Sequence, residues 1–165
     1  MKIDVYWIPE TPIGRLAIMP RPRAGDWLED ELQAWHRDGV DVIVCLLTQP
    51  ELRELGLQNE AAVAQAQGMQ FISYPISDYQ VPPSISDTLK LVDQIHTLLQ
   101  AHKGVLIHCQ MGIGRSSTIA ACVLQKQGLD ADTAFQALQT ARGLRVPDTD
   151  EQRRWATNFG KHLHN

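Results

Sequence analysis

The stretch VLIHCQMGIGRSS, at residues 105–117, decides the fold that this sequence predicts. An apolar run comes first, a polar segment covers residues 109–114, and a helical pattern begins near Arg115. The apolar run predicts a buried strand. Gly112 and Gly114 let the intervening backbone curl, because glycine adopts dihedral angles that other residues resist. A curled loop at a helix N-terminus turns successive N–H groups toward one point, and the helix dipole adds to the positive potential there. The segment therefore predicts a site for a tetrahedral anion.

Three side chains of this loop and of the helix start carry reactive chemistry. The positive potential favours a thiolate over a thiol at Cys109, and the thiolate is the nucleophilic form of cysteine. Arg115 can hold two oxygens of one phosphoryl group in a bidentate contact, which Lys cannot do. The hydroxyl of Ser116 is placed to hydrogen-bond the sulfur and ease its departure later in a reaction. The alternative interpretation is a buried cysteine beside a tight turn.

Strands and helices alternate outward from this stretch. The predicted strands cover 16–19, 40–47, 69–74 and 105–107. Two of the predicted helices start at Asp26 and at Ser84 or Ser86, and the others cover 50–56, 59–67, 115–127, 130–142 and 149–162. This order favours an α/β fold with a central, mostly parallel sheet flanked by helices. In such sheets, ligands sit beyond the carboxyl ends of the strands, which is where residues 109–114 would lie.

Length and composition narrow the classes of protein. The 165 residues suit a single domain over 1–165, with 44% hydrophobic residues to build its core. The net charge of −4 argues against a general nucleic-acid binder, which usually carries a basic excess. No apolar run reaches membrane-spanning length, so no membrane association is expected. Three cysteines without a dense framework suggest a reduced, cytoplasmic protein, and no Cys/His spacing resembles a zinc site.

The pattern His-Cys-x5-Arg-Ser resembles the phosphate-binding loop of cysteine-dependent protein tyrosine phosphatases. Length and glycine pattern are similar to the dual-specificity branch, and the upstream part resembles the cyclin-dependent-kinase-inhibitor-3-like phosphatases; the match extends from about residue 40 to residue 159. The resemblance implies a dual-specificity phosphatase-like fold and a two-step reaction. Cys109 attacks phosphorus and forms a phosphocysteine, which water then hydrolyses. No metal or other cofactor is implied.

This reaction needs a general acid to protonate the leaving oxygen. Asp78 is the candidate, since it lies in a Pro-bounded loop after a strand and the family places its acid there; the alternative is that it organises a turn with Ser77. Asp87 and Asp93 fall on an amphipathic helix and are weaker candidates. Asp148 would suit the low-molecular-weight phosphatases, whose acid follows the cysteine, but their nucleophile lies near the N-terminus.

Other polar residues near the motif have two interpretations each. His108 is expected to hydrogen-bond near the loop and tune Cys109, as the resemblance suggests, or to be a core residue. Gln152 matches a polar position that can orient the hydrolytic water, or it is an exposed residue in the first turn of a helix. Arg142 and Arg145 either widen the anion site or form a solvated helix end.

The remaining cysteines and the large aromatic residues have mainly structural interpretations. Cys45, at the end of a core strand, is either inert packing or a resolving thiol for Cys109, as in some relatives. Cys122 is expected in the core. Four aromatic residues at apolar helix positions are also assigned to the core: Trp27, Trp35, Trp155 and Phe159.

The side chains of the loop indicate the substrate. Gln110, Met111 and Ile113, which with Gly112 and Gly114 form the expected substrate-binding loop, are all uncharged. Phosphoinositide phosphatases of this superfamily place lysines there, so a phosphorylated protein carrying phosphotyrosine, or phosphoserine and phosphothreonine, is favoured. The alternatives are a catalytically weak phosphoprotein-binding module and a phosphatase for a non-protein phosphate such as RNA 5′-triphosphate. A monomer is expected.

Overall fold

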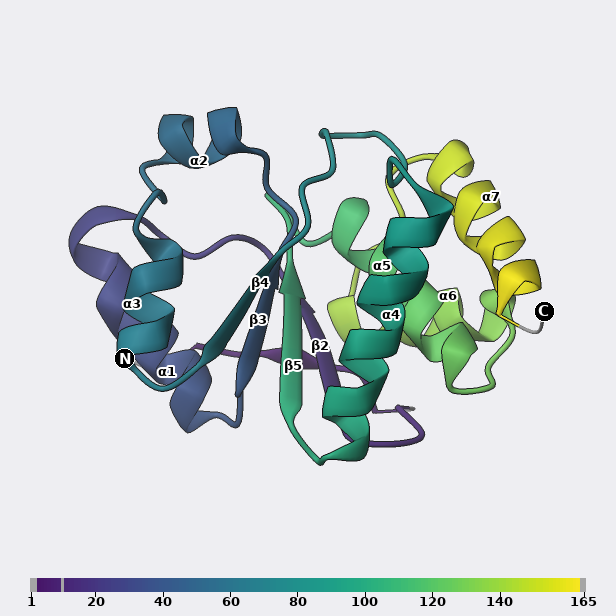
Figure 1. Ribbon diagram of the computed structural model, residues 1–165, viewed down its shortest axis with the longest axis horizontal. Coiled ribbons are helices and arrows are strands. Elements are labelled where there is room, and N and C mark those ends of the chain that lie inside the picture. The colour runs from purple at the N-terminus through teal and green to yellow at the C-terminus, as the bar shows by residue number, and fades with distance from the viewer. Residues whose placement is uncertain (1–2, 10, 164–165) are drawn as a thin grey trace.

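A mixed sheet runs through the middle of the computed structural model, which describes residues 3–9 and 11–163. Within that part the strand order is β1-β2-β5-β3-β4, and β1 is antiparallel to β2 while all other neighbours are parallel. The strands are β1 (Tyr6–Trp7), β2 (Arg15–Met19), β3 (Val42–Cys45), β4 (Gln70–Ser73) and β5 (Gly104–His108). The α/β fold with a central, mostly parallel sheet is therefore confirmed (Figure 1).

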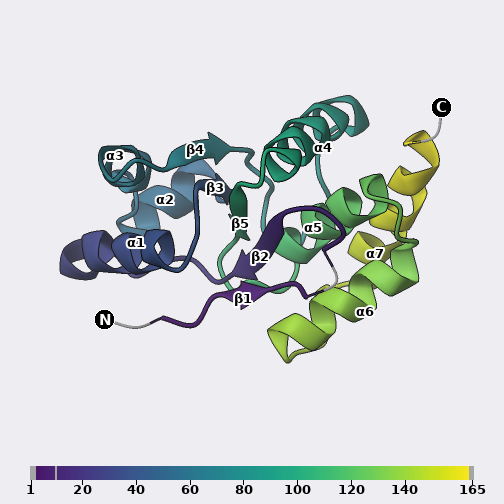
Figure 2. The same cartoon turned by 90° about the horizontal axis from the view of Figure 1, so that it is seen from below.

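Helices cover both faces of this sheet (Figure 2). One layer contains α1 (Leu28–Arg37), α2 (Gln49–Leu55) and α3 (Glu60–Ala66), and the other contains α4 (Ile85–Gln100), α5 (Arg115–Lys126), α6 (Ala131–Arg142) and α7 (Asp150–Phe159). Short 3₁₀ turns at Gly25–Trp27 and Gly160–His162 precede α1 and follow α7. No helix in the described ranges is long and apolar enough to cross a membrane.

The three inner strands, β2, β5 and β3, have buried side chains on both faces, as expected for a parallel sheet between helical layers, while the edge strands β1 and β4 are only partly buried. Alternate residues along each strand point to opposite layers. On β3, Ile43 and Cys45 pack with the α1 and α3 side, while Val42 and Val44 join the larger cluster under α4, α5 and α6. The unbroken apolar run of β3 in the sequence follows from this double burial.

Two expectations at helix starts are wrong. Residues 25–27 form a 3₁₀ turn, α1 begins only at Leu28, and its N-cap Trp27 is 52% exposed rather than in the core. For the last helix the sequence predicts Asp148 as the cap, paired with Glu151, but the helix begins at Asp150 with Thr149 as its N-cap. The expectations of burial hold for Trp35 and Phe159, which are 1% and 0% exposed.

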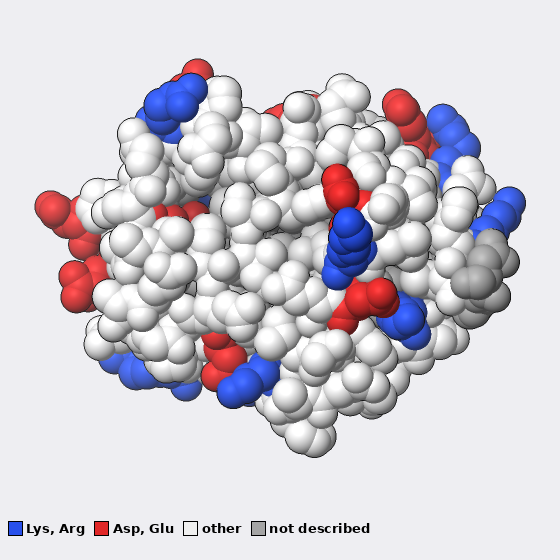
Figure 3. Space-filling model, viewed as in Figure 1, with Lys and Arg blue, Asp and Glu red and all other residues white. Residues whose placement is uncertain are grey.

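Charged side chains are interspersed on the face seen in Figure 3, with basic and acidic residues lying next to one another. Charged side chains are also paired across elements, such as Lys126 with Asp93 and Arg153 with Asp132. A local anion site must therefore be built from backbone amides and a few chosen side chains.

Candidate active site

The loop between β5 and α5 lies at the carboxyl edge of the sheet, and two glycines allow its shape for different reasons. Gly112 has a φ of +70°, and a Cβ there would lie 2.6 Å from the backbone of Met19 and Pro20, so both dihedral and space require glycine. Gly114 has an ordinary φ of −88°, which corrects the expectation of unusual dihedrals at this position. A Cβ at Gly114 would instead collide with the side chain of Asp148.

Neighbouring residues hold the loop from outside by donating hydrogen bonds to its carbonyl groups. The amide of Arg21 donates to the Gln110 carbonyl at 3.0 Å, and the guanidinium of Arg142 donates to the carbonyls of Met111 and Gly112 at 3.0 and 3.1 Å. Among the described residues, no backbone amide of 110–114 donates to a protein acceptor. Since the carbonyls are bound from outside, these amides are left available to an anion in the loop.

Arg142 is thus a brace for the loop rather than a solvated helix end. Its guanidinium also lies over the ring of Tyr6, 4.5 Å from the ring centroid. Arg145 is exposed and lines a cavity of about 480 Å³ together with Ile113 and Asp148. The two arginines that the sequence grouped together therefore have separate positions.

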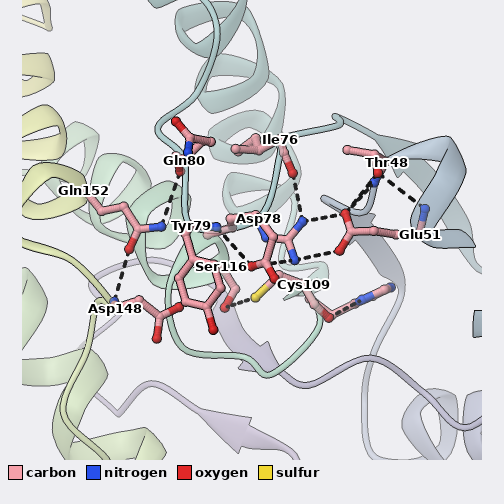
Figure 4. Close-up of polar contacts among 12 residues, drawn as sticks. Thr48, Glu51, Ile76, Asp78, Tyr79, Gln80, Cys109, Ser116, Asp148 and Gln152 are labelled. Atoms are coloured by element: carbon pink, nitrogen blue, oxygen red, sulfur yellow. Dashed lines mark hydrogen bonds and ion pairs between the residues drawn. The ribbon is translucent and has the colours of Figure 1, made fainter.

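Cys109 lies at the bottom of the loop and is 3% exposed. Its Sγ is 3.3 Å from Oγ of the fully buried Ser116, and the thiol donates to the hydroxyl in this hydrogen bond (Figure 4). The predicted contact between these two side chains is confirmed. In the thiolate form the direction reverses, because a sulfur anion can only accept and the hydroxyl can donate.

Arg115 begins α5 and is 1% exposed. Nη1 donates to Glu51 Oε1 at 2.7 Å and to the Ile76 carbonyl at 2.8 Å. Nη2 donates to Glu51 Oε2 at 2.9 Å and is paired with Asp78 Oδ1 at 3.1 Å. A guanidinium has five N–H groups. Both N–H groups of Nη1 and one of Nη2 are held by Glu51 and Ile76. The Nε–H and the Nη2–H that faces Asp78 therefore form the edge that can bind two oxygens of a phosphoryl group.

Glu51 is a site residue that the sequence reasoning missed. It belongs to a capping box at the start of α2, where the Thr48 amide donates to its carboxylate and its own amide donates to the Thr48 hydroxyl. Burial acts to raise the pKa of Glu51, but hydrogen bonds from Arg115 and Thr48 lower it overall. The Thr-x-x-Glu pattern directly after a buried strand was a signal in the sequence, since it places a carboxylate at the same sheet edge as Cys109.

Asp78 lies in the loop after β4, next to the guanidinium of Arg115 (Figure 4). Its Oδ1 accepts a hydrogen bond from the amide of Tyr79 at 3.0 Å, and its side chain is 43% exposed. The two weaker candidates lie elsewhere on α4: the amide of Asp87 is bound by the cap residue Ser84, and Asp93 is paired with Lys126. The structure thus brings Asp78 to the loop and leaves the other two outside it.

Asp148 and Gln152 form the opposite wall. Gln152 is fully buried, contrary to its interpretation as an exposed helix residue: its Oε1 accepts from the amides of Asp148 and Thr149, and its Nε2 donates to the Gln80 carbonyl at 3.3 Å. Burial and the nearby charge of Asp78 raise the pKa of Asp148 in spite of Arg115. Gln152 therefore ties the Asp78 loop to the start of α7.

His108 is fully buried behind the nucleophile. Its Nδ1 is 3.2 Å from the Cys109 carbonyl oxygen, and its Nε2 is 2.7 Å from Glu60 Oε2. Cys45 Sγ completes a group whose polar atoms lie within 4.8 Å of one another. Because Glu60 and His108 are already hydrogen-bonded to each other, we interpret this group as a buried ion pair and not as a metal centre.

The sequence and the fold were compared with known families, proteins and structures. Residues 17–129 match the family model described as a DSP-PTPase phosphatase of polymorphic toxin systems. The chain is 25% identical over 167 residues to cyclin-dependent kinase inhibitor 3 of Rattus norvegicus, which covers 95% of this chain and 78% of that protein. Kinase associated phosphatase, crystallised with serine at its catalytic-site cysteine, superimposes with a TM-score of 0.89 at 22% identity, covering 99% of this chain and 97% of that one. Tk-PTP in its active form gives 0.76 at 25% identity, with 98% and 99% covered.

Proposed function

This chain belongs to the DSP-PTPase phosphatase family, and we propose that residues 1–165 form one phosphatase domain that hydrolyses phosphotyrosine in proteins, with phosphoserine and phosphothreonine as further substrates. The observation that carries the proposal is the convergence of three features on one point. Cys109 Sγ is bound to Ser116, Arg115 offers one edge of its guanidinium, and the amides of 110–114 are free of protein acceptors.

The first step transfers the phosphoryl group to sulfur. The loop amides and Arg115 hold the three non-bridging oxygens, and the phosphate replaces Asp78 at Nη2 of Arg115. The Cys109 thiolate attacks phosphorus, the S–P bond forms, and the bond from phosphorus to the substrate oxygen breaks. Asp78, which takes up a proton from solvent when the phosphate displaces it from Arg115, donates this proton to the leaving oxygen, so the leaving group departs as a neutral alcohol or phenol.

The second step releases phosphate. Water attacks phosphorus, the S–P bond breaks, and Asp78, now a carboxylate, takes the proton of the water. The Ser116 hydroxyl donates a hydrogen bond to the departing sulfur, which returns as a thiolate. Gln152, held through the Gln80 carbonyl and the Asp148 amide, lies where a side-chain amide can orient the attacking water.

The loop composition supports a protein substrate. Gln110, Met111 and Ile113 place no positive charge beside the phosphate, whereas a ligand with several phosphates would need more cations. Kinase associated phosphatase is named for its association with a kinase. By analogy, we propose a phosphorylated protein as the partner of this chain. We also propose that the protein works as a monomer in the cytoplasm.

A substrate panel tests the proposal. Phosphotyrosine, phosphothreonine and phosphoserine peptides are compared with a phosphoinositide and an RNA 5′-triphosphate, each with wild type and with Cys109→Ser. We expect hydrolysis of the phosphopeptides, led by phosphotyrosine, and no turnover by Cys109→Ser. Preferred hydrolysis of the lipid or the RNA would replace the substrate class, and binding of phosphopeptides without turnover would indicate a binding module.

A further inference from the structure

We propose that Glu60 is a positioning residue for the nucleophile: from α3 it holds His108 as an imidazolium directly behind Cys109. The inference rests on the proposed function and adds to it a residue outside the phosphate-binding loop. Glu60 comes from the opposite helical layer to α5 and lies 48 positions from His108 in the sequence.

The hydrogen bonds of the ring indicate its protonation when Glu60 is ionised. Nε2 faces the carboxylate of Glu60 at 2.7 Å, and Nδ1 faces the carbonyl oxygen of Cys109 at 3.2 Å. A carboxylate and a carbonyl oxygen can only accept hydrogen bonds, so both ring nitrogens must carry a proton to satisfy both contacts. A doubly protonated ring is a cation, and Glu60 is the carboxylate that balances it.

Burial makes this pair strongly interdependent. The side chains of His108 and Glu60 are 0% and 1% exposed, and a buried charge without a partner is costly. Glu60 Oε1 has no hydrogen-bond partner among the described residues, so the pairing with His108 is the carboxylate's main compensation. Without the negative charge of Glu60, the buried imidazolium of His108 is no longer stabilised and the neutral ring is favoured.

The other groups that face the ring add no competing cation. Cys45 approaches from β3, the Trp35 ring of α1 lies with its centroid 6.2 Å from the imidazole, and Cys109 follows in the chain. Burial acts against the charged form, but Glu60 and Cys45 outweigh it and raise the pKa of His108 well above its usual value.

The consequence reaches the nucleophile in two ways. The imidazolium donates a hydrogen bond to the carbonyl of Cys109, which fixes the direction of the loop where it leaves β5. The ring also lies nearer to the Cys109 backbone than Glu60 does, because Nδ1 contacts the Cys109 carbonyl and Glu60 contacts the other ring nitrogen. The positive end of the pair therefore faces the Cys109 backbone, and we expect it to favour a thiolate at this residue.

The variant Glu60→Gln tests this at constant side-chain size. Alkylation of Cys109 by iodoacetamide, a neutral reagent, is followed by peptide mass mapping from pH 5 to pH 10. We expect the rate at pH 6 to fall about 5- to 10-fold, as for the loss of a nearby charge worth up to one pH unit, while the rate at pH 10 stays within about twofold. Glu60→Asp, which keeps the charge, should recover part of the loss.

Two comparisons keep the result interpretable. Glu31→Gln removes another buried glutamate, which lies on α1, pairs with Arg23 and has no contact with His108, and should leave the alkylation profile unchanged. Nitrogen-15 NMR of wild type at pH 7 should show both ring nitrogens of His108 protonated, and Glu60→Gln should show one. An unmoved profile in folded Glu60→Gln, or a neutral His108 in wild type, would overturn the proposal.

Neither readout requires a phosphate ester. A protein that shows the expected His108 signals but hydrolyses nothing in the substrate panel would keep the Glu60 proposal and lose the proposed function. Hydrolysis with a neutral His108 would give the reverse outcome. Failure of Glu60→Gln to fold would leave the wild-type NMR measurement to decide.

Discussion

Replacing Glu51 by Gln should disable Arg115 without touching the loop that binds phosphate. Glu51 supplies both oxygens of a bidentate pair at 2.7 and 2.9 Å, and Arg115 keeps only the Ile76 carbonyl and Asp78 when that pair is lost. Gln can accept one hydrogen bond through its oxygen, but its amide group would face a donor on the guanidinium. The arginine then loses the contact that fixes its orientation before phosphate binds.

The expected magnitude follows from one lost charge-assisted hydrogen bond. Such bonds contribute about 1.5–3 kcal/mol each, and the 16% exposure of the Glu51 side chain places the loss toward the lower part of that range. A loss of about 2 kcal/mol in the transition state corresponds to a decrease of about 30-fold in kcat/KM. The assay is hydrolysis of p-nitrophenyl phosphate at pH 6.5, with KM and kcat determined separately.

A matched control lies one turn further along the same helix. Glu54 is exposed and lies three residues after Glu51 on α2. Glu54→Gln removes the same charge from the same helix, but no contact between Glu54 and Arg115 is lost. Its kcat/KM should stay within about twofold of wild type, as expected for a screened surface charge. If Glu51→Gln also stays within that range, Arg115 does not depend on Glu51 and the reasoning is refuted.

Stability should report the same pair through its pH dependence. Because the pKa of Glu51 in the folded protein is lower than its ordinary value of 4.5, its pairing stabilises the fold above that pH and is lost as pH falls through the lowered value. Wild type should therefore exceed Glu51→Gln in melting temperature at pH 7. The difference should shrink as the pH is taken below 4.5, and a constant difference would contradict the ion pair.

Three further changes test separate parts of the site. Asp78→Asn should lower kcat by about 100-fold or more for phenyl phosphate, whose leaving group needs a proton, and much less for an activated aryl phosphate; an equal loss with both would remove Asp78 as the acid. Arg142→Ala should lower kcat/KM about tenfold by releasing the loop carbonyls, whereas Arg145→Ala should change it less than threefold for this small substrate; equal effects would deny the brace. Thr149→Ala should cost about 1 kcal/mol, or ~3 °C in Tm, by removing the cap of α7, and an unchanged Tm would contradict the capping box.

The loop could be predicted from the sequence because all its parts are contiguous. Cys109, Arg115 and Ser116 come from thirteen consecutive residues in which strand, turn and helix signals follow one another. Asp78 was located by its Pro-bounded loop after a strand together with the family resemblance, and that strand, β4, is separated from β5 by β3. Parallel strands then bring both loops to one edge, so the sheet topology completes what the local pattern began.

The supporting contacts could not be predicted because they join distant segments. Glu51 and Glu60 meet Arg115 and His108 from 64 and 48 positions away. The capping box of Glu51 indicated its sheet edge but not the cation that it meets, and Glu60 alone is one acidic residue at the start of a short helix. Propensity and periodicity describe a residue's own element and carry no information on which buried cation it meets across the sheet edge.

One local error has a similarly physical origin. Two overlapping patterns, Asp148 with Glu151 and Thr149 with Gln152, both fit a capping pair at the start of the last helix. The structure uses the second, because the Gln152 side chain reaches the Thr149 amide while it also binds Gln80 on the Asp78 loop. A tertiary contact therefore decides which of the two overlapping capping patterns forms.

The most direct measurement of the central claim is capture of the covalent intermediate. Wild-type protein is mixed with ³²P-labelled phosphotyrosine peptide, quenched in acid within milliseconds and digested for peptide mapping. We expect label on the peptide that contains Cys109 and none in Cys109→Ser. Label on any other residue, or continued hydrolysis by Cys109→Ser, would contradict it.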